Sequence, residues 1–364
     1  MDAELPDNTA VLSASAKIAN HREDFAQRNH FLNTATVGVP PKRAVEALTR
    51  AVEMWSRGEG DVAAFDSAVD RSRAAFAHLT QVELSTVGIV GQASVAAGMV
   101  ASSLEPGSQV LVAEEDFTSV LFPFLVGHRD SRLRVTAVPL ERLTEAITQD
   151  TSLVAVSAVQ SADGRVIDLD ALSTTCRNLG VRTYLDVTQA AGWLPIHGGD
   201  FDVIAAGAYK WLCSPRGTGF FAINPNSQSW VRPIFAGWYS GEDPWSTVYG
   251  PPLRLASDAR AYQVSPAWLG SVAAAQAMDL LDQIGTQAIY AHNLELTQTF
   301  CEAMGIPPQN SAIVSIPTDV TPEILEQSGV VAAFRDGKLR LSFHLYNDFN
   351  DLEAVLRALA SSRR

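Results

Sequence analysis

The stretch Thr183-Tyr-Leu-Asp-Val-Thr-Gln189 decides the fold of this chain, together with Ala208-Tyr-Lys-Trp-Leu212 a short distance further on. In the first stretch a continuous apolar run ends in an acid, Asp186, and in the second Lys210 follows another apolar run. Continuous apolar runs are typical of strands that are buried on both faces of a parallel sheet. The two stretches therefore predict an acid and an amine at the carboxyl edge of one buried sheet.

Further segments of this kind extend the pattern in both directions and alternate with helical patterns. The helical pattern at 169–179, for example, ends at Gly180, which is a typical C-cap. This alternation predicts an α/β layered domain with a largely parallel sheet. The strand-like segments are residues 86–90, 109–113, 134–138, 153–157, 183–186, 202–206 and 219–223.

The composition changes at residues 225–266, where tryptophan and tyrosine alternate with proline. Two interpretations of this segment stay open: a connecting loop that packs its own aromatic side chains, or a wall of a substrate pocket. After it the pattern becomes α+β, with a hairpin signal at Asp336-Gly337. We expect helices at 268–284, 286–304 and 348–360, and strands at 313–316, 330–334 and 339–343.

The length of 364 residues suggests two domains, because single cores rarely grow this large. We expect a large α/β domain over residues 33–240. Residues 1–32 together with 241–364 are expected to form the smaller α+β domain.

Acidic residues outnumber basic ones by 40 to 27, giving a net charge of −13. This charge argues against nucleic acids and anionic membranes as partners, because binding them requires a positive field. No segment resembles a signal peptide or a membrane span, so we expect a cytoplasmic protein. The three cysteines are far apart, which predicts neither disulfides nor a metal site.

The chain has only four lysines: Lys17, Lys42, Lys210 and Lys338. Lys210 alone lies in an apolar context, and desolvation should lower its pKa toward that of a nucleophilic amine. A buried amine that forms a Schiff base, with a carboxylate that keeps a pyridine nitrogen protonated, meets the minimal requirement for binding pyridoxal phosphate.

Asp186, Gln189, Lys210, Gly217 and Gly219 reproduce a known pattern of Asp-x-x-Gln, then about twenty residues, then Lys and a Gly-rich turn. In this pattern the chain resembles the class V aminotransferase family of fold-type I pyridoxal-phosphate enzymes. That family includes cysteine desulfurases, kynureninase and isopenicillin-N-epimerase-like proteins. The resemblance covers roughly residues 30–360. It implies a large, mostly parallel seven-stranded sheet domain and a smaller α+β domain.

The resemblance also implies roles for individual residues. Lys210 would bind the cofactor and move the proton at the substrate Cα, Asp186 would pair with the pyridine nitrogen, and Gln189 would bind the 3-oxygen. The cofactor phosphate would lie between a strand and a helix, where backbone N–H groups can bind an anion. The residues implied there are Gln92, Ala93 and Ser94, of which Ser94 alone could also be a simple helix N-cap.

Three more residues are implied to contact the cofactor. Tyr209 takes the place of a phosphate-contacting histidine, or is simply a half-buried strand residue. Phe117 takes the place of a ring-stacking histidine, or is simply a core residue. Ser265 would reach the phosphate of a neighbouring subunit, which requires a homodimer with the active site at the interface.

Two residues are implied to bind the substrate. Arg340 in the strand Leu339-Arg-Leu-Ser-Phe343 would bind the α-carboxylate, since a guanidinium fork suits a bidentate carboxylate. On its own, Arg340 could equally be an exposed strand residue. Gln160 would lie close to the cofactor or to the substrate carboxylate.

The chain departs from the desulfurase pattern in two places. No cysteine stands shortly before Arg340, and Phe117 cannot transfer a proton as a histidine can. We therefore expect chemistry at the Cα or Cβ of an L-amino acid or amino-acid conjugate, of the aminotransferase type. The alternatives are a β-eliminating C–S lyase on a cysteine conjugate, an epimerase and a decarboxylating deaminase. A non-catalytic cofactor-binding relative is the alternative of a different class.

Overall fold

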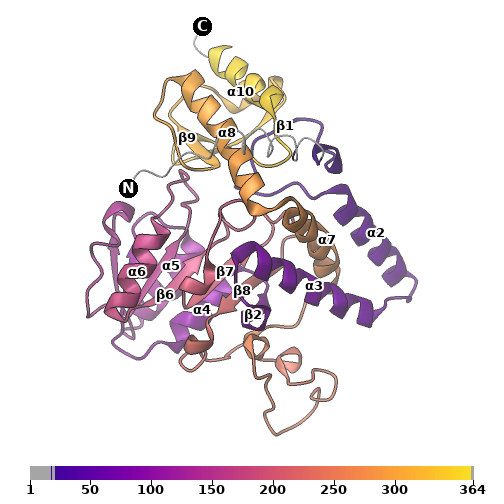
Figure 1. The fold of residues 1–364 in the computed structure, drawn as a ribbon, viewed down its shortest axis with the longest axis vertical. Coiled ribbons are helices and arrows are strands. Elements are labelled where there is room, and N and C mark those ends of the chain that lie inside the picture. The colour runs from indigo at the N-terminus through magenta and orange to yellow at the C-terminus, as the bar shows by residue number, and fades with distance from the viewer. Residues whose placement is uncertain (1–17, 19–20, 362–364) are drawn as a thin grey trace.

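A computed structural model describes residue 18 and residues 21–361 of the chain (Figure 1). Lys17 and the first part of the predicted small domain, residues 1–17 and 19–20, lie outside the described residues. No helix in the described part is both long and apolar enough to cross a bilayer.

The centre of the molecule is a seven-stranded sheet with the order β2-β8-β7-β6-β5-β3-β4. Only β8 runs antiparallel to its neighbours, β2 and β7, so the carboxyl ends of the other six strands share one edge. The seven predicted strands are confirmed to within one residue at each end. Their bounds are β2 Val87–Val90, β3 Gln109–Ala113, β4 Arg134–Val138, β5 Leu153–Ser157, β6 Arg182–Asp186, β7 Val203–Gly207 and β8 Gly219–Ile223.

Alternate residues of the central strands pack into two different hydrophobic cores. Tyr184 and Phe221 face the core that contains α4 and α5, whereas Leu185 and Phe220 face the core that contains α3, α6 and α7. Helices on both faces explain why the strands read as continuous apolar runs. Gly180 ends α6 with a φ of 68°, as predicted. The helices are α2 Lys42–Ser56, α3 Val62–Thr80, α4 Ala93–Ser103, α5 Thr118–Arg129, α6 Leu169–Leu179 and α7 Trp268–Ile284.

The C-terminal part is built around a small antiparallel sheet with the order β11-β12-β9. The hairpin at Asp336-Gly337 is confirmed, and both residues have a positive φ, 48° and 71°. The predicted strand at 330–334 is wrong in one respect, because it is interrupted at Ala332. Its first half pairs with β1 and its second half with β12. The elements are β1 His30–Phe31, α8 Thr286–Met304, β9 Ile313–Ile316, α9 Pro322–Gln327, β10 Val330–Val331, β11 Ala333–Arg335, β12 Lys338–Ser342 and α10 Phe349–Ser361. The domain boundaries at 33–240 stay a prediction.

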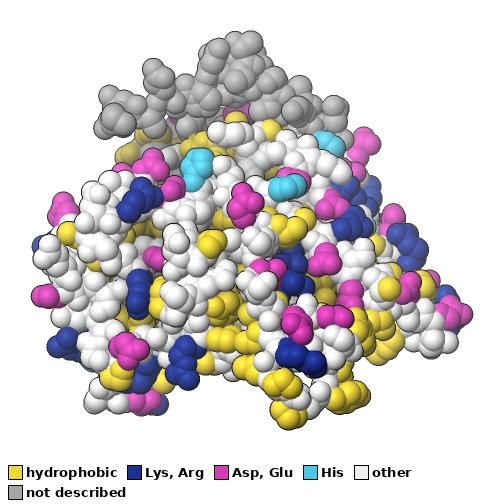
Figure 2. All heavy atoms as spheres, turned by 60° about the horizontal axis from the view of Figure 1, so that its bottom comes forward, with side chains coloured by type: hydrophobic (Ala, Val, Ile, Leu, Met, Phe, Trp, Pro, Cys, Tyr) yellow, Lys and Arg dark blue, Asp and Glu magenta, His cyan; other side chains and the backbone are white. Residues whose placement is uncertain are grey.

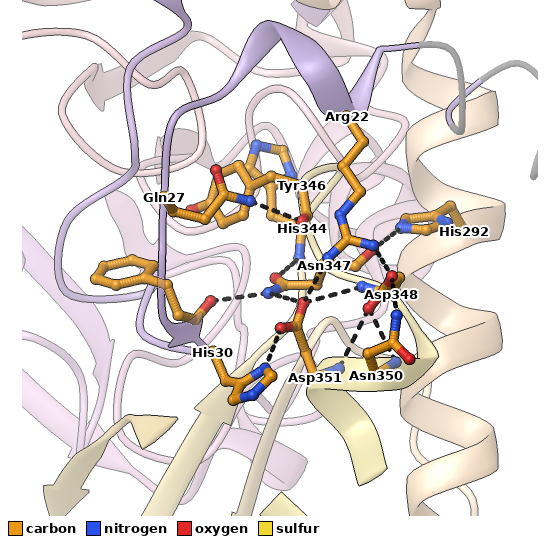
Figure 3. Close-up of polar contacts among 11 residues, drawn as sticks. Arg22, Gln27, His30, His292, His344, Tyr346, Asn347, Asp348, Asn350 and Asp351 are labelled. Atoms are coloured by element: carbon orange, nitrogen blue, oxygen red, sulfur yellow. Dashed lines mark hydrogen bonds and ion pairs between the residues drawn. The ribbon is translucent and has the colours of Figure 1, made fainter. Parts of the chain in front are cut away.

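A buried carboxylate, Asp351, joins the N-terminal segment to the C-terminal part (Figure 3). One of its oxygens accepts a hydrogen bond from His30 Nδ1 at 2.7 Å, and the other accepts from Asn347 Nδ2 at 3.2 Å. Asn347 Nδ2 also donates to the carbonyl oxygen of Phe31 at 2.8 Å. These bonds fix the point from which the chain continues into residues 33–38, a segment that contacts the candidate site.

The segment 225–266 is irregular, as predicted, and protrudes from the body of the molecule (Figure 1). Asp66 on α3 anchors it through hydrogen bonds from two of its aromatic side chains and accepts a third from Trp268, the first residue of α7. Its oxygens accept from Tyr239 Oη at 3.0 Å, Trp268 Nε1 at 3.0 Å and Trp245 Nε1 at 3.1 Å. The ring of Trp238 packs against all three donors.

Replacing Asp66 with alanine should lower the free energy of unfolding by about 2 kcal/mol, because three donors lose a charged acceptor at once. Urea unfolding of the purified protein measures this change. Asp70→Ala is the matched control, since its exposed carboxylate makes one ion pair, with Arg73, and should change stability by less than about 1 kcal/mol. Equal effects of the two substitutions would contradict the anchoring role of Asp66.

Candidate active site

A cavity of about 420 Å³ opens at the carboxyl edge of the large sheet. Most of its residues follow the ends of β2, β3, β5, β6 and β7, and the rest precede the start of β8. This is where ligands bind in open parallel sheets. The lining residues are Gly91, Gln92, Ala93, Phe117, Ser119, Ser157, Ser161, Asp186, Thr188, Gln189, Gly207, Tyr209, Lys210, Arg216 and Gly217.

Lys210 is only 4% exposed, and its amine lies 5.2 Å from the ring centre of Phe117. Burial lowers the pKa of Lys210 to about 8; Asp186 opposes this shift, and Arg340, Arg335 and Arg216 add to it. The prediction of a desolvated amine at residue 210 thus agrees with the structure.

The backbone at Lys210 is held by a second segment of the chain. Gly38 donates from its backbone N–H to the carbonyl oxygen of Tyr209 at 2.9 Å. A Cβ atom at Gly38 would overlap the carbonyl oxygen of Lys210, so only glycine allows this close approach.

Asp186 ends β6 beside Lys210 and is 4% exposed. Its Oδ1 accepts a hydrogen bond from the backbone N–H of Thr188 at 2.7 Å. Burial raises the pKa of Asp186 to about 6, while Lys210 acts in the opposite direction. Within the described residues no ion pair joins the two groups, so the acid and the amine face one cavity without contacting each other.

Phe117 lines the cavity with 44% of its surface exposed, so it is not a core residue. The buried carboxylate of Asp116 positions it, because Asp116 Oδ1 accepts from the backbone N–H of Phe117 at 2.6 Å. Asp116 Oδ2 accepts from the backbone N–H of Ser157 at 2.7 Å. Our sequence reasoning missed Asp116, although an acid directly after a buried strand was a usable signal.

Helix α4 points its first turn at the cavity. Gln92, in an extended conformation, is the N-cap, and no side chain caps the helix. Because the helix begins at Ala93, the interpretation of Ser94 as the N-cap is wrong; Ser94 is the second helical residue and does not line the cavity. The uncapped backbone N–H groups and the positive end of the helix dipole can hold an anion.

Gln189 lines the cavity, but the protein already uses its polar atoms. Its Nε2 donates to Ala35 O at 3.0 Å and to Ser161 Oγ at 2.9 Å, and its Oε1 accepts from Trp211 Nε1 at 2.8 Å. Ser161 in turn contacts Arg340.

Arg340 is 2% exposed and donates to Ser161 and to Thr36 Oγ1, which excludes an exposed strand arginine. It therefore adjoins the cavity through Ser161 rather than lining it.

The structure places two predicted residues outside the cavity. Gln160 is buried behind it, where its Nε2 donates weakly to Ser157 O at 3.4 Å. Ser265 is exposed and lies outside this cavity of its own subunit.

Tyr209 and Arg216 form the entrance side of the cavity, and the guanidinium of Arg216 lies 4.9 Å from the ring centre of Tyr209. Tyr209 is thus a cavity residue, and Arg216 is a further one that sequence reasoning missed.

In the described part of the chain, no residue of 225–266 lines this cavity, so the structure favours the self-packing interpretation of that segment. The three cysteines are buried elsewhere.

Reductive methylation with formaldehyde should modify Lys210 with a midpoint near pH 8, because the neutral amine is the reactive form and burial has lowered its pKa. Lys42 and Lys338, whose side chains are exposed, serve as internal controls. Peptide mass spectrometry measures all of them in one sample. Modification of the three lysines with the same pH dependence would contradict a desolvated Lys210.

Comparison with known proteins gives a consistent result. A family model described as Aminotransferase class-V matches residues 43–325. An uncharacterized aminotransferase, YcbU, of Bacillus subtilis (strain 168) is 28% identical over 316 residues, covering 80% of this chain and 82% of the relative.

Two solved structures are similar over nearly the whole chain. The apo cysteine desulfurase from Thermococcus onnurineus NA1 has a TM-score of 0.82 at 18% identity. The match covers 94% of this chain and 97% of the desulfurase chain. The cystine C–S lyase C-DES, in complex with cysteine persulfide, has a TM-score of 0.81 at 19% identity. The match covers 92% of this chain and 97% of the lyase chain.

The structural likenesses confirm the predicted fold, that of fold-type I pyridoxal-phosphate enzymes, and the family match confirms the predicted cofactor at the level of the family. The family model covers well over half of the sequence. The chain belongs to the class V aminotransferase family, whose members are pyridoxal-phosphate-dependent enzymes.

Proposed function

We propose that this chain is a pyridoxal-phosphate-dependent enzyme that acts at the Cα of an L-amino acid or amino-acid conjugate, with aminotransferase-type chemistry. One observation carries the proposal: a buried amine, Lys210, and a buried acid, Asp186, face one cavity without forming an ion pair. Two oppositely charged groups that are buried but unpaired are costly, and a ligand that lies between them offsets that cost.

The residues of the cavity fit the cofactor. Lys210 would hold its aldehyde carbon, Asp186 its ring nitrogen, and Phe117 its ring face. The uncapped start of α4 at Gln92 and Ala93 would hold the phosphate, with Ser94 in the same turn and Tyr209 and Arg216 beside it. Gln189 would donate to the 3-oxygen by releasing either Ser161 or the carbonyl oxygen of Ala35.

When bound, pyridoxal phosphate supplies the electron sink for chemistry at the substrate Cα. The lowered pKa of Lys210 makes its amine a base that can take and return the Cα proton near neutral pH. Arg340 would bind the α-carboxylate and orient the Cα toward Lys210. Gln160 lies behind the cavity and would act on the substrate only through its neighbours.

A C–S lyase that cleaves at Cβ is the second candidate, because the same amine and acid would serve elimination. Epimerisation and decarboxylating deamination use the same residues as well. Persulfide chemistry of the desulfurase type is disfavoured because none of the three buried cysteines lines the cavity.

A homodimer with a shared active site is part of the proposal. Figure 2 views the face from which residues 225–266 protrude and shows exposed hydrophobic side chains gathered there. Exposed Ser265 would contact the partner's phosphate. The large exposed side chains of the segment, which support a subunit contact, are Ile234, Phe235, Trp245, Tyr249 and Leu253. The cytoplasmic location stays a prediction.

Replacing Lys210 with alanine should shift the visible absorption band of the bound cofactor and lower turnover by at least ~10²-fold, since the same group binds the cofactor and moves the proton. Lys338→Ala, at the exposed end of β12, is the control and should leave both unchanged. Absorption spectra of the two purified variants measure the effect. A parent protein that is colourless and takes up no pyridoxal phosphate would sink the enzyme proposal and favour a non-catalytic relative.

Incubation with a panel of L-amino acids separates the two candidate reactions. We expect repeated turnover only when a keto-acid acceptor is present, because an aminotransferase returns the amino group to an acceptor. Without an acceptor, the reaction should stop after one equivalent of keto-acid product and one of pyridoxamine phosphate have formed. Release of pyruvate and ammonia without an acceptor would instead establish the lyase.

A further inference from the structure

Two arginines of the C-terminal hairpin converge on one hydroxyl group next to the candidate site. Arg340 Nη2 donates to Thr36 Oγ1 at 2.7 Å, and Arg335 Nη2 donates to the same oxygen at 3.3 Å. The two contacts place these nitrogens within about 6 Å of each other, where like charges repel unless an anion lies between them.

The register of the hairpin explains the convergence. Ala333 on β11 is opposite Arg340 on β12, and Arg335 is two residues beyond Ala333. Residues two apart in a strand lie on the same face, so both arginines lie on one face of the small sheet. The close approach is therefore built into the backbone pairing and not only into the side-chain rotamers.

No acid compensates this pair. Among the residues that the structure describes, neither Arg335 nor Arg340 makes an ion pair with a carboxylate. Burial, and then the charge of Arg335, lower the pKa of Arg340 to about 10. Uncompensated cations are unexpected in a protein with a net charge of −13.

The hydroxyl of Thr36 adds a third donor. Its oxygen accepts both guanidinium hydrogen bonds, and in the described part of the chain its own proton has no acceptor. A hydroxyl has one proton to donate and two lone pairs to accept with. Two guanidinium groups and the O–H of Thr36 thus lie together, and among the described residues no carboxylate accepts from any of them.

We propose that Arg335 and Thr36, next to Arg340, form a subsite for a second anionic group, so that the substrate is a dicarboxylic amino acid. This inference rests on the proposed function, in which Arg340 binds the α-carboxylate and leaves Arg335 for the side-chain carboxylate. Arg335 is exposed, so it can exchange its contact with Thr36 for a bidentate contact with a carboxylate. The chain of contacts from Arg340 through Ser161 to Gln189 joins the subsite to the cavity.

Binding of unreactive acids to the cofactor-loaded protein tests the subsite. Succinate and maleate carry two carboxylates, and propionate carries one. Calorimetry should show that the diacids bind at least tenfold more tightly than propionate to the parent protein. Arg335→Gln should weaken diacid binding roughly 10-fold or more and change propionate binding much less, because it removes one charge-assisted contact. Arg335→Lys should retain part of the preference.

Arg57→Gln is the matched control, since Arg57 is also exposed but lies at the end of α2 beside Glu59. It should leave the binding of both kinds of acid unchanged. Equal affinity of the parent protein for diacids and propionate, or an unchanged ratio in Arg335→Gln, would overturn the subsite.

The visible band of the parent protein separates this outcome from failure of the proposed function. If the band is present and the diacid preference is absent, only the subsite is wrong. If the parent protein takes up no cofactor, the proposed function fails, and calorimetry on the same protein still tests Arg335.

Discussion

The burial of one amine at the end of β7 is the constraint on which the rest of the site depends. An ammonium group that is removed from water without an ion-pair partner is destabilised, and Lys210 responds with a lowered pKa. The opposite shift occurs at Asp186, where burial raises the pKa of the acid. Burial therefore favours the neutral form of both groups. The neutral form is the reactive form of the amine, and the cavity that both groups face can accept a polar ligand.

Holding these groups apart requires a rigid frame, and residues 33–38 connect its parts. Gly38 packs on the backbone of Lys210, the carbonyl of Ala35 accepts from Gln189, and Thr36 accepts from the arginines of the hairpin. The segment is itself fixed by β1, which Asp351 ties to α10. A short stretch with little regular structure thus connects the large sheet to the C-terminal part at the cavity.

The sequence predicts the large sheet well because each strand is buried on both faces and reads as an uninterrupted apolar run. Lys210, Asp186 and Phe117 follow directly from strand ends, so their place at the cavity could be predicted. Gln160 and Ser94 could not be placed, since a shift of one or two residues at a strand or helix end decides whether a side chain faces a cavity. The break at Ala332 depends on pairing with β1, a partner about three hundred residues away in the sequence.

That Arg335 and Arg340 share a face could be predicted once the hairpin at Asp336-Gly337 was recognised, because a two-residue turn fixes which residues lie on the same side of the strands. The contact of both arginines with Thr36 could not be predicted, because Thr36 lies near the other end of the sequence. The large sheet supplies Lys210 and Asp186, whereas the hairpin supplies the arginines. A substitution on β11 can therefore alter the acids that are bound while leaving the amine and its partner acid in place. In the proposed function, substrate choice and proton transfer would therefore be carried by separate elements.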